Sequence, residues 1–423
     1  MRILHTSDWH LGKNLEQINR IEEQKEFINE FCTIVEEEKI DLILIAGDIF
    51  DTYNPSAAAE ELFYDAINRL NDKGKRAVVV IAGNHDNPER LCAASPLAYK
   101  NGIILLGYPN SNASDYKVTT ENIKIINSGS GWLEISIKAC EHNAVIITLP
   151  YPSESRLEEM LSSNADEQLL QKAYSEKIGS VFISLSENYR DDTVNLAVGH
   201  LFMRGGKESD SERTLQVGGA LTVDAGMLPS NAHFVALGHL HRPQEIKKAP
   251  CPVFYSGSPL AYSFSEAEYS KAVYIVDVIP GQQAEIKPYY LKCGKPLKKW
   301  VAKEGIGQAL QWCEEGKDKN AWVDLEIVTD RILTIEEQKK LRSLHNGILH
   351  IRPRLKQTEQ IDMLDTNRES RSLNELFKDY FHYRTGSKIP DELMKTFLEV
   401  INDEDEEIES TMEEGGVIAT ETT

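Results

Sequence analysis

Five short apolar runs in the first part of the chain each end in a polar cluster, and this arrangement restricts the fold more than any other feature. The runs are residues 2–7, 41–46, 76–82, 194–198 and 233–237. Apolar positions at helical spacing occupy 20–38 and 56–72, between the first three runs. Such alternation predicts βαβ units and a largely parallel sheet of buried strands. Because ligands bind beyond the carboxyl ends of parallel strands, we expect the five clusters to converge on one site.

The clusters contain side chains of the types that bind metal ions. In chain order they are Asp8-Trp9-His10, Gly47-Asp48, Gly83-Asn84-His85-Asp86, Gly199-His200 and Gly238-His239-Leu240-His241. The candidate ligands are Asp8, His10, Asp48, Asn84, His200, His239 and His241. An isolated Asp-x-His pair could lie on the surface, and an isolated Gly-Asn-His-Asp run could be a turn. Five clusters in order, each after a strand, instead predict a metal centre.

The donor set indicates which metals to expect. Its seven side chains exceed the needs of one ion and suit two ions that share a bridging carboxylate. Imidazole and carboxylate ligands without thiolate favour manganese, iron or zinc over calcium or magnesium. The donor set therefore predicts two divalent metal ions, with manganese, iron and zinc as the candidates.

The ordered motifs resemble the calcineurin-like metallophosphoesterase superfamily. Within it, the chain is most similar to the SbcD family of bacterial nuclease subunits. The similar runs are Asp8-Trp9-His10-Leu11-Gly12, Ala46-Gly47-Asp48-Ile49-Phe50-Asp51, Ser211-Glu212-Arg213, Ala236-Leu237-Gly238-His239-Leu240-His241 and Leu376 to Gly386. The resemblance extends from residue 1 to near residue 402. It implies an α/β metallophosphoesterase sandwich with a small α/β capping domain and C-terminal helices.

The resemblance also implies a role for each site residue. One metal ion would be held by Asp8, His10, Asp48 and His241, and the other by Asp48, Asn84, His200 and His239. His85 would be a catalytic residue that is not a ligand and that protonates the leaving oxygen or stabilises the transition state. Asp51 would orient His85. The residues alone leave open that Asp51 is only a capping or supporting group.

The chain beyond residue 291 is predicted to form additional structure. The phosphoesterase domain is expected to span 1–291, with a hairpin turn at Pro280-Gly281-Gln282-Gln283. A small β-α-β-α-β layer is expected within 295–356. Its strands are predicted at 298–303, 321–328 and 348–355, and its helices at 305–314 and 334–345. The resemblance implies that this layer is a capping domain that narrows access to the site and contacts DNA.

Residues 370–402 carry apolar positions on one face of each of two predicted helices, 372–384 and 391–402. Two short helices cover only part of each other's apolar face, and the remainder would form a patch of the kind that marks partner sites. The resemblance implies that these helices bind an SbcC-like ATPase subunit. The residues alone leave open that the pair folds back onto 295–356. The tail 403–423 is rich in Asp and Glu, lacks Lys and Arg, and is predicted to be disordered.

The net charge of −21 argues at first against a nucleic-acid partner. Part of that charge lies in the tail, and bound metal ions would add positive charge where a phosphate meets the site. An acidic surface, with DNA held by a partner protein, stays open as the alternative. We expect no membrane span and no secretory signal. The six scattered cysteines predict free thiols in a cytoplasmic, reducing compartment.

These features together predict a two-metal DNA nuclease, a double-strand exonuclease and single-strand endonuclease that acts with an ATPase subunit in DNA repair and recombination. The sequence has no G-x-x-x-x-G-K-[ST] motif, so ATP dependence would have to come from another chain. The alternatives are a protein phosphatase or nucleotide phosphodiesterase on the same metal centre, and a docking scaffold without activity. The additional chain beyond 291 favours the nuclease, and the full ligand set with His85 disfavours the scaffold.

The resemblance further implies a homodimer, formed through helix 56–72 and the segment 91–99. The apolar residues expected at this interface are Leu62, Phe63, Ala66, Ile67, Leu70, Leu91, Ala94, Leu97 and Tyr99. The alternative is that these side chains face inward, because a helix beside a sheet needs only one apolar face.

Overall fold

The computed structural model of the chain describes residues 1–113, 120–162, 174–212 and 221–355, together with 377–378, 381, 389–390 and 393–394. The chain divides into two compact units, one comprising Met1–Lys299 with Asn320–Asp324 and the other Trp300–Lys319 with Leu325–Thr423. Apart from residues 377–378, 381 and 393–394, the predicted C-terminal helices lie outside the described residues, as does the tail 403–423.

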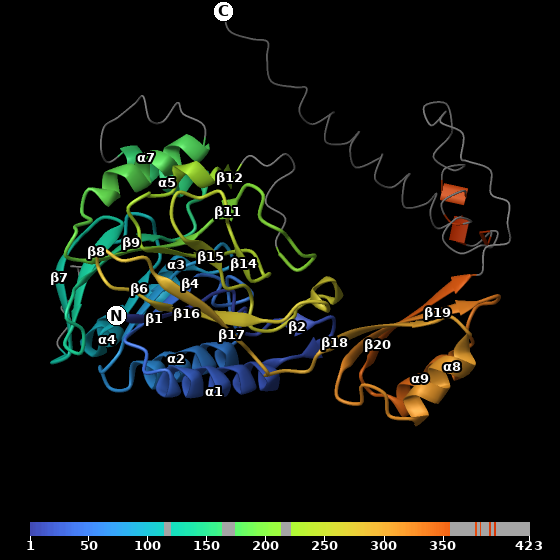
Figure 1. The fold of residues 1–423 in the computed structure, drawn as a ribbon. Coiled ribbons are helices and arrows are strands. Elements are labelled where there is room, and N and C mark those ends of the chain that lie inside the picture. The colour runs from blue at the N-terminus through green and yellow to red at the C-terminus, as the bar shows by residue number, and fades with distance from the viewer. Residues whose placement is uncertain are drawn as a thin grey trace, which may run out of the picture. The chain divides into compact units, whose positions relative to one another are not determined.

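Two sheets form the centre of the first unit (Figure 1). The first sheet contains β17 (Glu285–Tyr290), β16 (Ala272–Asp277), β1 (Arg2–Thr6), β4 (Leu42–Ala46), β5 (Ala77–Ile81) and β6 (Ile103–Leu106), in that order. Strands β1, β4, β5 and β6 are parallel, whereas β16 and β17 add antiparallel pairs at the other edge. The parallel βαβ arrangement predicted for the first three apolar runs is therefore confirmed.

The second sheet contains the two remaining strands that carry polar clusters. Its order is β14 (Gln244–Glu245), β15 (Val253–Tyr255), β13 (Phe234–Gly238), β10 (Val194–His200), β9 (Ala144–Leu149), β8 (Trp132–Ile137) and β7 (Ile123–Gly129). Strands β9, β10, β13 and β15 are parallel. Side chains from both sheets share one buried apolar cluster, which includes Leu44, Val79, Leu196 and Phe234. The two sheets therefore pack face to face, as the predicted sandwich requires.

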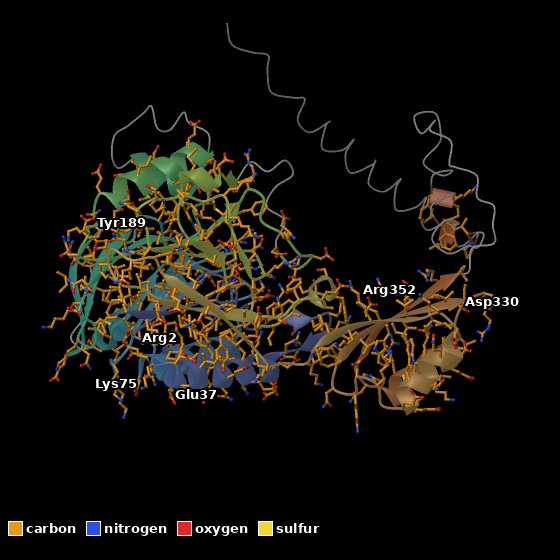
Figure 2. All side chains as sticks on the ribbon, in the orientation of Figure 1. Arg2, Glu37, Lys75, Tyr189, Asp330 and Arg352 are labelled. Carbon is orange, nitrogen blue, oxygen red and sulfur yellow. The ribbon has the colours of Figure 1, made fainter. Side chains whose placement is uncertain are left out.

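Helices cover the outer face of each sheet (Figure 1). Helices α1 (Ile21–Glu37) and α2 (Ala57–Asn71) pack on the first sheet, and α5 (Glu154–Ser162) and α7 (Tyr174–Ser186) pack on the second. Helix α2 begins where the sequence predicts, because the Ser56 hydroxyl accepts a hydrogen bond from the Ala59 amide at 3.3 Å. Polar side chains such as Glu37 and Lys75 point outward from this unit (Figure 2).

Short elements connect these layers. They are β2 (Asn14–Leu15), β3 (Ile18–Asn19), α3 (Pro88–Cys92), α4 (Ser95–Ala98), β11 (Phe202–Met203) and β12 (Thr222–Val223), and the 3₁₀ turns η1 (Tyr99–Asn101), η3 (Ala225–Met227) and η4 (Phe264–Glu266). Every helix among the described residues is too short or too polar to cross a lipid bilayer.

The apolar face of α2 that was predicted to form a dimer interface packs inward in this chain. Leu62, Phe63, Ala66, Ile67 and Leu70 all belong to the buried core under the first sheet. Leu91 and Tyr99 are also buried. This outcome corrects the expected interface, because one apolar face on α2 suffices to cover the sheet. Of the side chains named for that interface, Leu97 is strongly exposed, at 69%.

A small sheet has the order β18 (Leu297–Ala302), β19 (Trp322–Thr329) and β20 (Ile348–Leu355), and most of its residues belong to the second unit. Helices α8 (Ile306–Glu314) and α9 (Ile335–Leu344) contact each other, and α9 contacts β20. Helix α9 begins with a capping box between Thr334 and Glu337. The order of these elements is the β-α-β-α-β order expected from the sequence.

Candidate metal centre

The five predicted polar clusters lie together in the first unit, at the carboxyl ends of β1, β4, β5, β10 and β13. Hydrogen bonds between the loops hold them in register. The amide of Asp8 donates to the Gly47 carbonyl, and the amide of His10 donates to the Asp48 carbonyl, both at 3.0 Å. The amide of His239 donates to Asp8 Oδ1 at 2.8 Å, which joins a loop of one sheet to a loop of the other.

Six of the seven candidate ligands form two compact groups. Within each group, one nitrogen or oxygen of every side chain lies within 4.8 Å of the others, and all six residues are buried. The first group is Asp8, His10 and His241, and the second is Asp48, His200 and His239. Asp48 Oδ2 lies 3.6 Å from His10 Nε2 and 3.5 Å from His200 Nε2, so its carboxylate stands between the groups.

The seventh candidate, Asn84, completes the second group. Its Oδ1 lies 2.9 Å from His200 Nε2 and 3.0 Å from His239 Nδ1. Its buried Nδ2 has no hydrogen-bond partner among the described residues. In the first group, His10 Nε2 and His241 Nε2 face each other at 2.9 Å. Nitrogen and oxygen lone pairs that converge on one another are what two cation sites require. The donor set therefore fits two divalent ions.

Strained backbone coincides with these residues. Positive φ angles, which residues other than glycine rarely adopt, occur at four of the donor residues. They are 53° at Asp8, 44° at His10, 51° at Asp48 and 108° at His239. Conformations of this kind each cost about 1–3 kcal/mol and persist where the surrounding structure enforces them, commonly at functional sites. The surrounding structure thus keeps the backbone of these donor residues in a conformation that they would rarely adopt by themselves.

Two motif glycines are required because other groups approach too closely. A Cβ atom on Gly83 would lie 2.1 Å from Asp48 Oδ1, and one on Gly238 would lie 1.8 Å from the Ala46 carbonyl oxygen. Any side chain at either position would displace the loops that carry Asp48 or His239. The glycines of the Gly-Asn-His-Asp and Gly-His-x-His motifs are therefore part of the site's geometry.

Burial and charge set the protonation of the clustered groups. Burial lowers the pKa of His10 and of His239 to about 3, which keeps both imidazoles in the neutral form that binds metals. Burial raises the pKa of Asp8 to about 6. Burial would also raise the pKa of Asp48, but the charge and hydrogen bond of His200 outweigh it and hold that pKa well below its usual range. Burial favours neutral His200, but Asp48 reverses this and raises the pKa of His200 to about 9.

His85 lies beside the first group. Its ring centroid is 4.8 Å from that of His10, and its Nδ1 lies 2.7 Å from the main-chain carbonyl oxygen of Asp51. A carbonyl oxygen only accepts hydrogen bonds, so His85 donates from Nδ1 and its Nε2 remains available. The main-chain amide of His85 donates to Asp48 Oδ1 at 2.9 Å.

The Asp51 side chain lies next to Lys13 and His10. Its carboxylate lies 2.9 Å from Lys13 Nζ and 3.6 Å from His10 Nδ1. Burial would raise the pKa of Asp51, but His10 and Lys13 together lower it below its usual range. His85 Nδ1 donates to the main-chain carbonyl of Asp51, and the Asp51 carboxylate lies within 4.8 Å of a ring nitrogen of His10 and of His85. An orienting role of this carboxylate toward His85 stays a prediction.

Sequence reasoning gave no role to several residues that support the site. The carboxylate of Asp86 accepts hydrogen bonds from the amides of Gly83, Ile49 and Phe50. Its place three residues after Gly83 is the signal of a carboxylate that closes its own turn. Ser211 and Glu266 stand behind His241. The spacing from Ser263 to Glu266 is that of a capping box, so the sequence could have shown that a helical turn begins at Ser263. It could not have shown that Glu266 lies near His241.

Comparisons with known proteins cover both units. The model of the calcineurin-like phosphoesterase family matches residues 1–243, and that of the type 5 capsule protein repressor C-terminal domain matches residues 293–385. The chain is 48% identical over 412 residues to the SbcD subunit of the nuclease SbcCD of Bacillus subtilis (strain 168), an alignment that covers 96% of this chain and 99% of that protein. It is 32% identical over 350 residues to the corresponding SbcD subunit of Staphylococcus epidermidis (strain ATCC 12228 / FDA PCI 1200), covering 82% of this chain and 84% of that one.

Proposed function

Since this chain belongs to the calcineurin-like phosphoesterase family, and within it to the family of SbcD subunits of the nuclease SbcCD, we propose that it is a metal-dependent nuclease that hydrolyses the phosphodiester backbone of DNA. The observation that carries the proposal is the pair of buried donor groups on either side of Asp48. A protein phosphatase or nucleotide phosphodiesterase is the alternative on the same centre.

In the proposed site, one ion would be held by Asp8, His10, Asp48 and His241. The other would be held by Asp48, Asn84, His200 and His239. When bound, two divalent ions, which we propose to be manganese, would supply positive charge to stabilise an in-line displacement at phosphorus. The nitrogen and oxygen donors, without a thiolate, are compatible with manganese.

His85 is proposed to act on the leaving group. Its Nδ1 is engaged by the Asp51 carbonyl, so Nε2 is the atom that can carry a proton to the departing oxygen. The protonated ring would transfer that proton as the P–O bond breaks. Because the His85 main-chain amide contacts Asp48, the same loop couples this ring to the centre of the donor set.

The substrate class is tested by comparing three phosphate esters in the presence of manganese. The wild-type protein is expected to hydrolyse bis(p-nitrophenyl) phosphate by itself and an end-labelled DNA duplex when the ATPase subunit is added, and to act far more slowly on p-nitrophenyl phosphate. Faster hydrolysis of the monoester, with no product from DNA, would contradict the nuclease and favour the phosphatase.

Replacing Asp51 with alanine is expected to lower the affinity of the protein for the first metal ion and to leave the His85 ring in its place. The variant keeps the main-chain carbonyl that binds His85 and loses the carboxylate near His10 Nδ1. Removing a group that orients a ligand typically costs about 10–100-fold in metal affinity. Titration calorimetry with manganese measures this loss, and Asp51→Asn serves as the shape-matched control. Unchanged affinity with a large fall in rate would assign the carboxylate to His85 instead.

We propose that DNA processing depends on an SbcC-like ATPase subunit, bound through residues 370–402. The proposal rests on the two relatives named as subunits of SbcCD and on the C-terminal domain matched over 293–385. A chain that ends at Asp365 is expected to load metal and to cleave the model diester as the full chain does. It should fail to bind the ATPase subunit in a pull-down and should lose ATP-dependent degradation of duplex ends. Undiminished capture of that subunit would place the docking surface elsewhere.

We further propose a homodimer in a reducing, cytosolic compartment, the latter supported by the six free cysteines. Because the apolar face of α2 is covered by the core, the exposed Leu97 on α4 becomes the residue to test. Light scattering at micromolar concentration is expected to give twice the monomer mass for the wild type. Leu97→Glu should shift the mass toward the monomer, whereas a monomeric wild type would exclude the dimer.

A further inference from the structure

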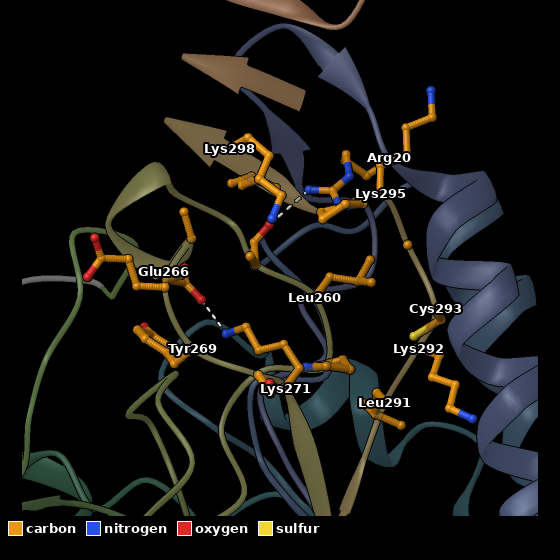
Figure 3. Close-up of a pocket in the computed structure, with 18 residues that line it drawn as sticks. Arg20, Leu260, Glu266, Tyr269, Lys271, Leu291, Lys292, Cys293, Lys295 and Lys298 are labelled. Carbon is orange, nitrogen blue, oxygen red and sulfur yellow. Dashed lines mark hydrogen bonds and ion pairs between the residues drawn. The ribbon is translucent and has the colours of Figure 1, made fainter. Parts of the chain in front are cut away.

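Glu266 is a fully buried carboxylate behind the first donor group. It ends the 3₁₀ turn η4 and lines a cavity of about 360 Å³ in the first unit, together with Lys271, Tyr269 and Leu260. In Figure 3 a dashed line marks the ion pair between its carboxylate and the ammonium group of Lys271. A buried charge is costly unless every lone pair is used, so the partners of Glu266 indicate what it does.

All the groups around the Glu266 carboxylate are donors. Oε1 lies 2.5 Å from Ser211 Oγ and 3.1 Å from the amides of Tyr262 and Ser263. Oε2 receives hydrogen bonds from Lys271 Nζ and from Ser258 Oγ. An ionised carboxylate has no hydrogen to give. The single hydroxyl hydrogen of Ser211 therefore points to Glu266.

This direction determines which ring nitrogen of the neighbouring histidine faces Ser211 as a donor. Ser211 Oγ also lies 2.5 Å from His241 Nδ1. Since the hydroxyl hydrogen is donated to Glu266, Ser211 accepts in this contact and the imidazole donates from Nδ1. The neutral ring then carries its free lone pair on Nε2, the atom that faces His10 Nε2 at 2.9 Å.

We infer that Glu266, acting through Ser211, fixes the tautomer and the ring orientation of His241 and so positions it to bind the first metal ion. The inference rests on the proposed two-metal function and assigns Ser211 and Glu266 as positioning residues. Ligating histidines generally donate their other ring nitrogen to a carboxylate, a carbonyl or water, and such partners tune metal affinity. Here the donation passes through a hydroxyl group to a buried carboxylate.

The same network holds the main chain at His241. Lys271 Nζ donates to the His241 carbonyl oxygen at 3.0 Å and to Ser258 Oγ at 2.8 Å. The amide of His241 donates to Glu212 Oε1 at 2.8 Å. Hydrogen bonds from the segments 211–212 and 258–271 therefore fix both the ring and the backbone of His241.

The Nδ1 atoms of two other histidines at the site bond to main-chain carbonyls. Nδ1 of His200 bonds to the Ala46 carbonyl at 2.9 Å, and that of His85 to the Asp51 carbonyl. No side-chain substitution removes those acceptors. His241 differs because its acceptor is a side chain, so its orientation can be tested without altering a ligand.

A purely structural role for Glu266 makes a different prediction. If Glu266 served only to neutralise buried Lys271, the Ser211 hydroxyl would be dispensable, because the ion pair does not pass through it. If Glu266 acts on His241, removal of that hydroxyl alone breaks the connection. Ser211→Ala therefore separates the two roles and leaves the buried ion pair intact.

The experiment is a manganese titration of the metal-free, full-length protein by calorimetry. Two sites are expected for the wild type, and Ser211→Ala should bind one ion about 10–100-fold more weakly and the other unchanged. Ser211→Thr, which keeps the hydroxyl, should restore affinity to within a few-fold. Ser265→Ala is the matched control, since that nearby hydroxyl bonds to Ser263 and to the Asp210 amide, away from the His241 ring.

A second readout concerns the ring itself. In protein with ¹⁵N-labelled histidine, the Nδ1-protonated signature of His241 should be present in the wild type and in Ser211→Thr, and should be lost or averaged in Ser211→Ala. Glu266→Gln should alter the same signal, with its thermal unfolding midpoint recorded to separate misfolding from loss of the relay. Unchanged affinity and an unchanged signal in Ser211→Ala would overturn the inference. A wild-type protein without two manganese sites would instead overturn the proposed function.

Discussion

His85→Ala is expected to retain both metal ions and to lose at least about a hundredfold in the rate of diester hydrolysis, as general acids contribute in this range. The reason lies in which atoms of His85 are used. Its main-chain amide donates to Asp48 Oδ1, and that contact survives the substitution. The imidazole, held at Nδ1 by the Asp51 carbonyl, is removed without disturbing the donors of either group.

Metal analysis after gel filtration tests the first half of this expectation. The rings of His85 and His10 and the carboxylate of Asp51 also form a compact group of possible ligands, so a ligand role for His85 is a defined competitor. Loss of an ion from His85→Ala would show that His85 is a metal ligand and would contradict its proposed role as a general acid.

The dependence on leaving group tests the second half. A substrate that releases p-nitrophenolate needs little protonation of the departing oxygen, whereas DNA releases an alkoxide that needs it strongly. The defect of His85→Ala should therefore be smaller for the nitrophenyl diester than for DNA. An equal defect on both substrates would favour transition-state stabilisation by the ring over proton donation.

The sequence predicted the donor groups well because their signal is local. Asp8, Asp48 and His239 each follow an apolar strand within a few residues, and parallel strands bring their carboxyl ends to one edge. The two sheets then unite donors that are far apart in the chain, such as His10 and His241. The predicted strand ends were sufficient to bring these donors to one site, whereas the order of the strands in the two sheets comes from the structure.

The supporting contacts could not be predicted in the same way. Ser211 and Glu266 are 55 residues apart, and both lie outside the strands, so no periodicity connects them. His85 Nδ1 donates to the main-chain carbonyl of Asp51, and the identity of residue 51 carries no information about a main-chain acceptor. The face of α2 was misassigned because an apolar stripe fits a sheet as well as it fits a partner helix.

Asp48→Ala is expected to abolish the binding of metal ions at the two-metal centre, because the Asp48 carboxylate is close to both donor groups. Its Oδ2 lies 3.6 Å from His10 Nε2 and 3.5 Å from His200 Nε2, and its Oδ1 receives the His85 amide. Loss of a shared ligand should leave fewer than two ions per chain. Losing several kcal/mol of transition-state stabilisation corresponds to at least about a thousandfold in rate.

The matched comparison is Asp8→Ala, whose side chain belongs to the first group alone. The Asp8→Ala variant should lose one ion and keep the other, whereas Asp48→Ala should weaken the binding of both ions. Asp48→Asn keeps the shape of the side chain and removes its charge, so it should resemble Asp48→Ala in metal content if the bridging charge is what matters. Unfolding midpoints of the metal-free proteins show whether each variant folds. Two retained ions in a folded Asp48→Ala protein would contradict the bridge, since ions held without Asp48 would be bound by two independent sites.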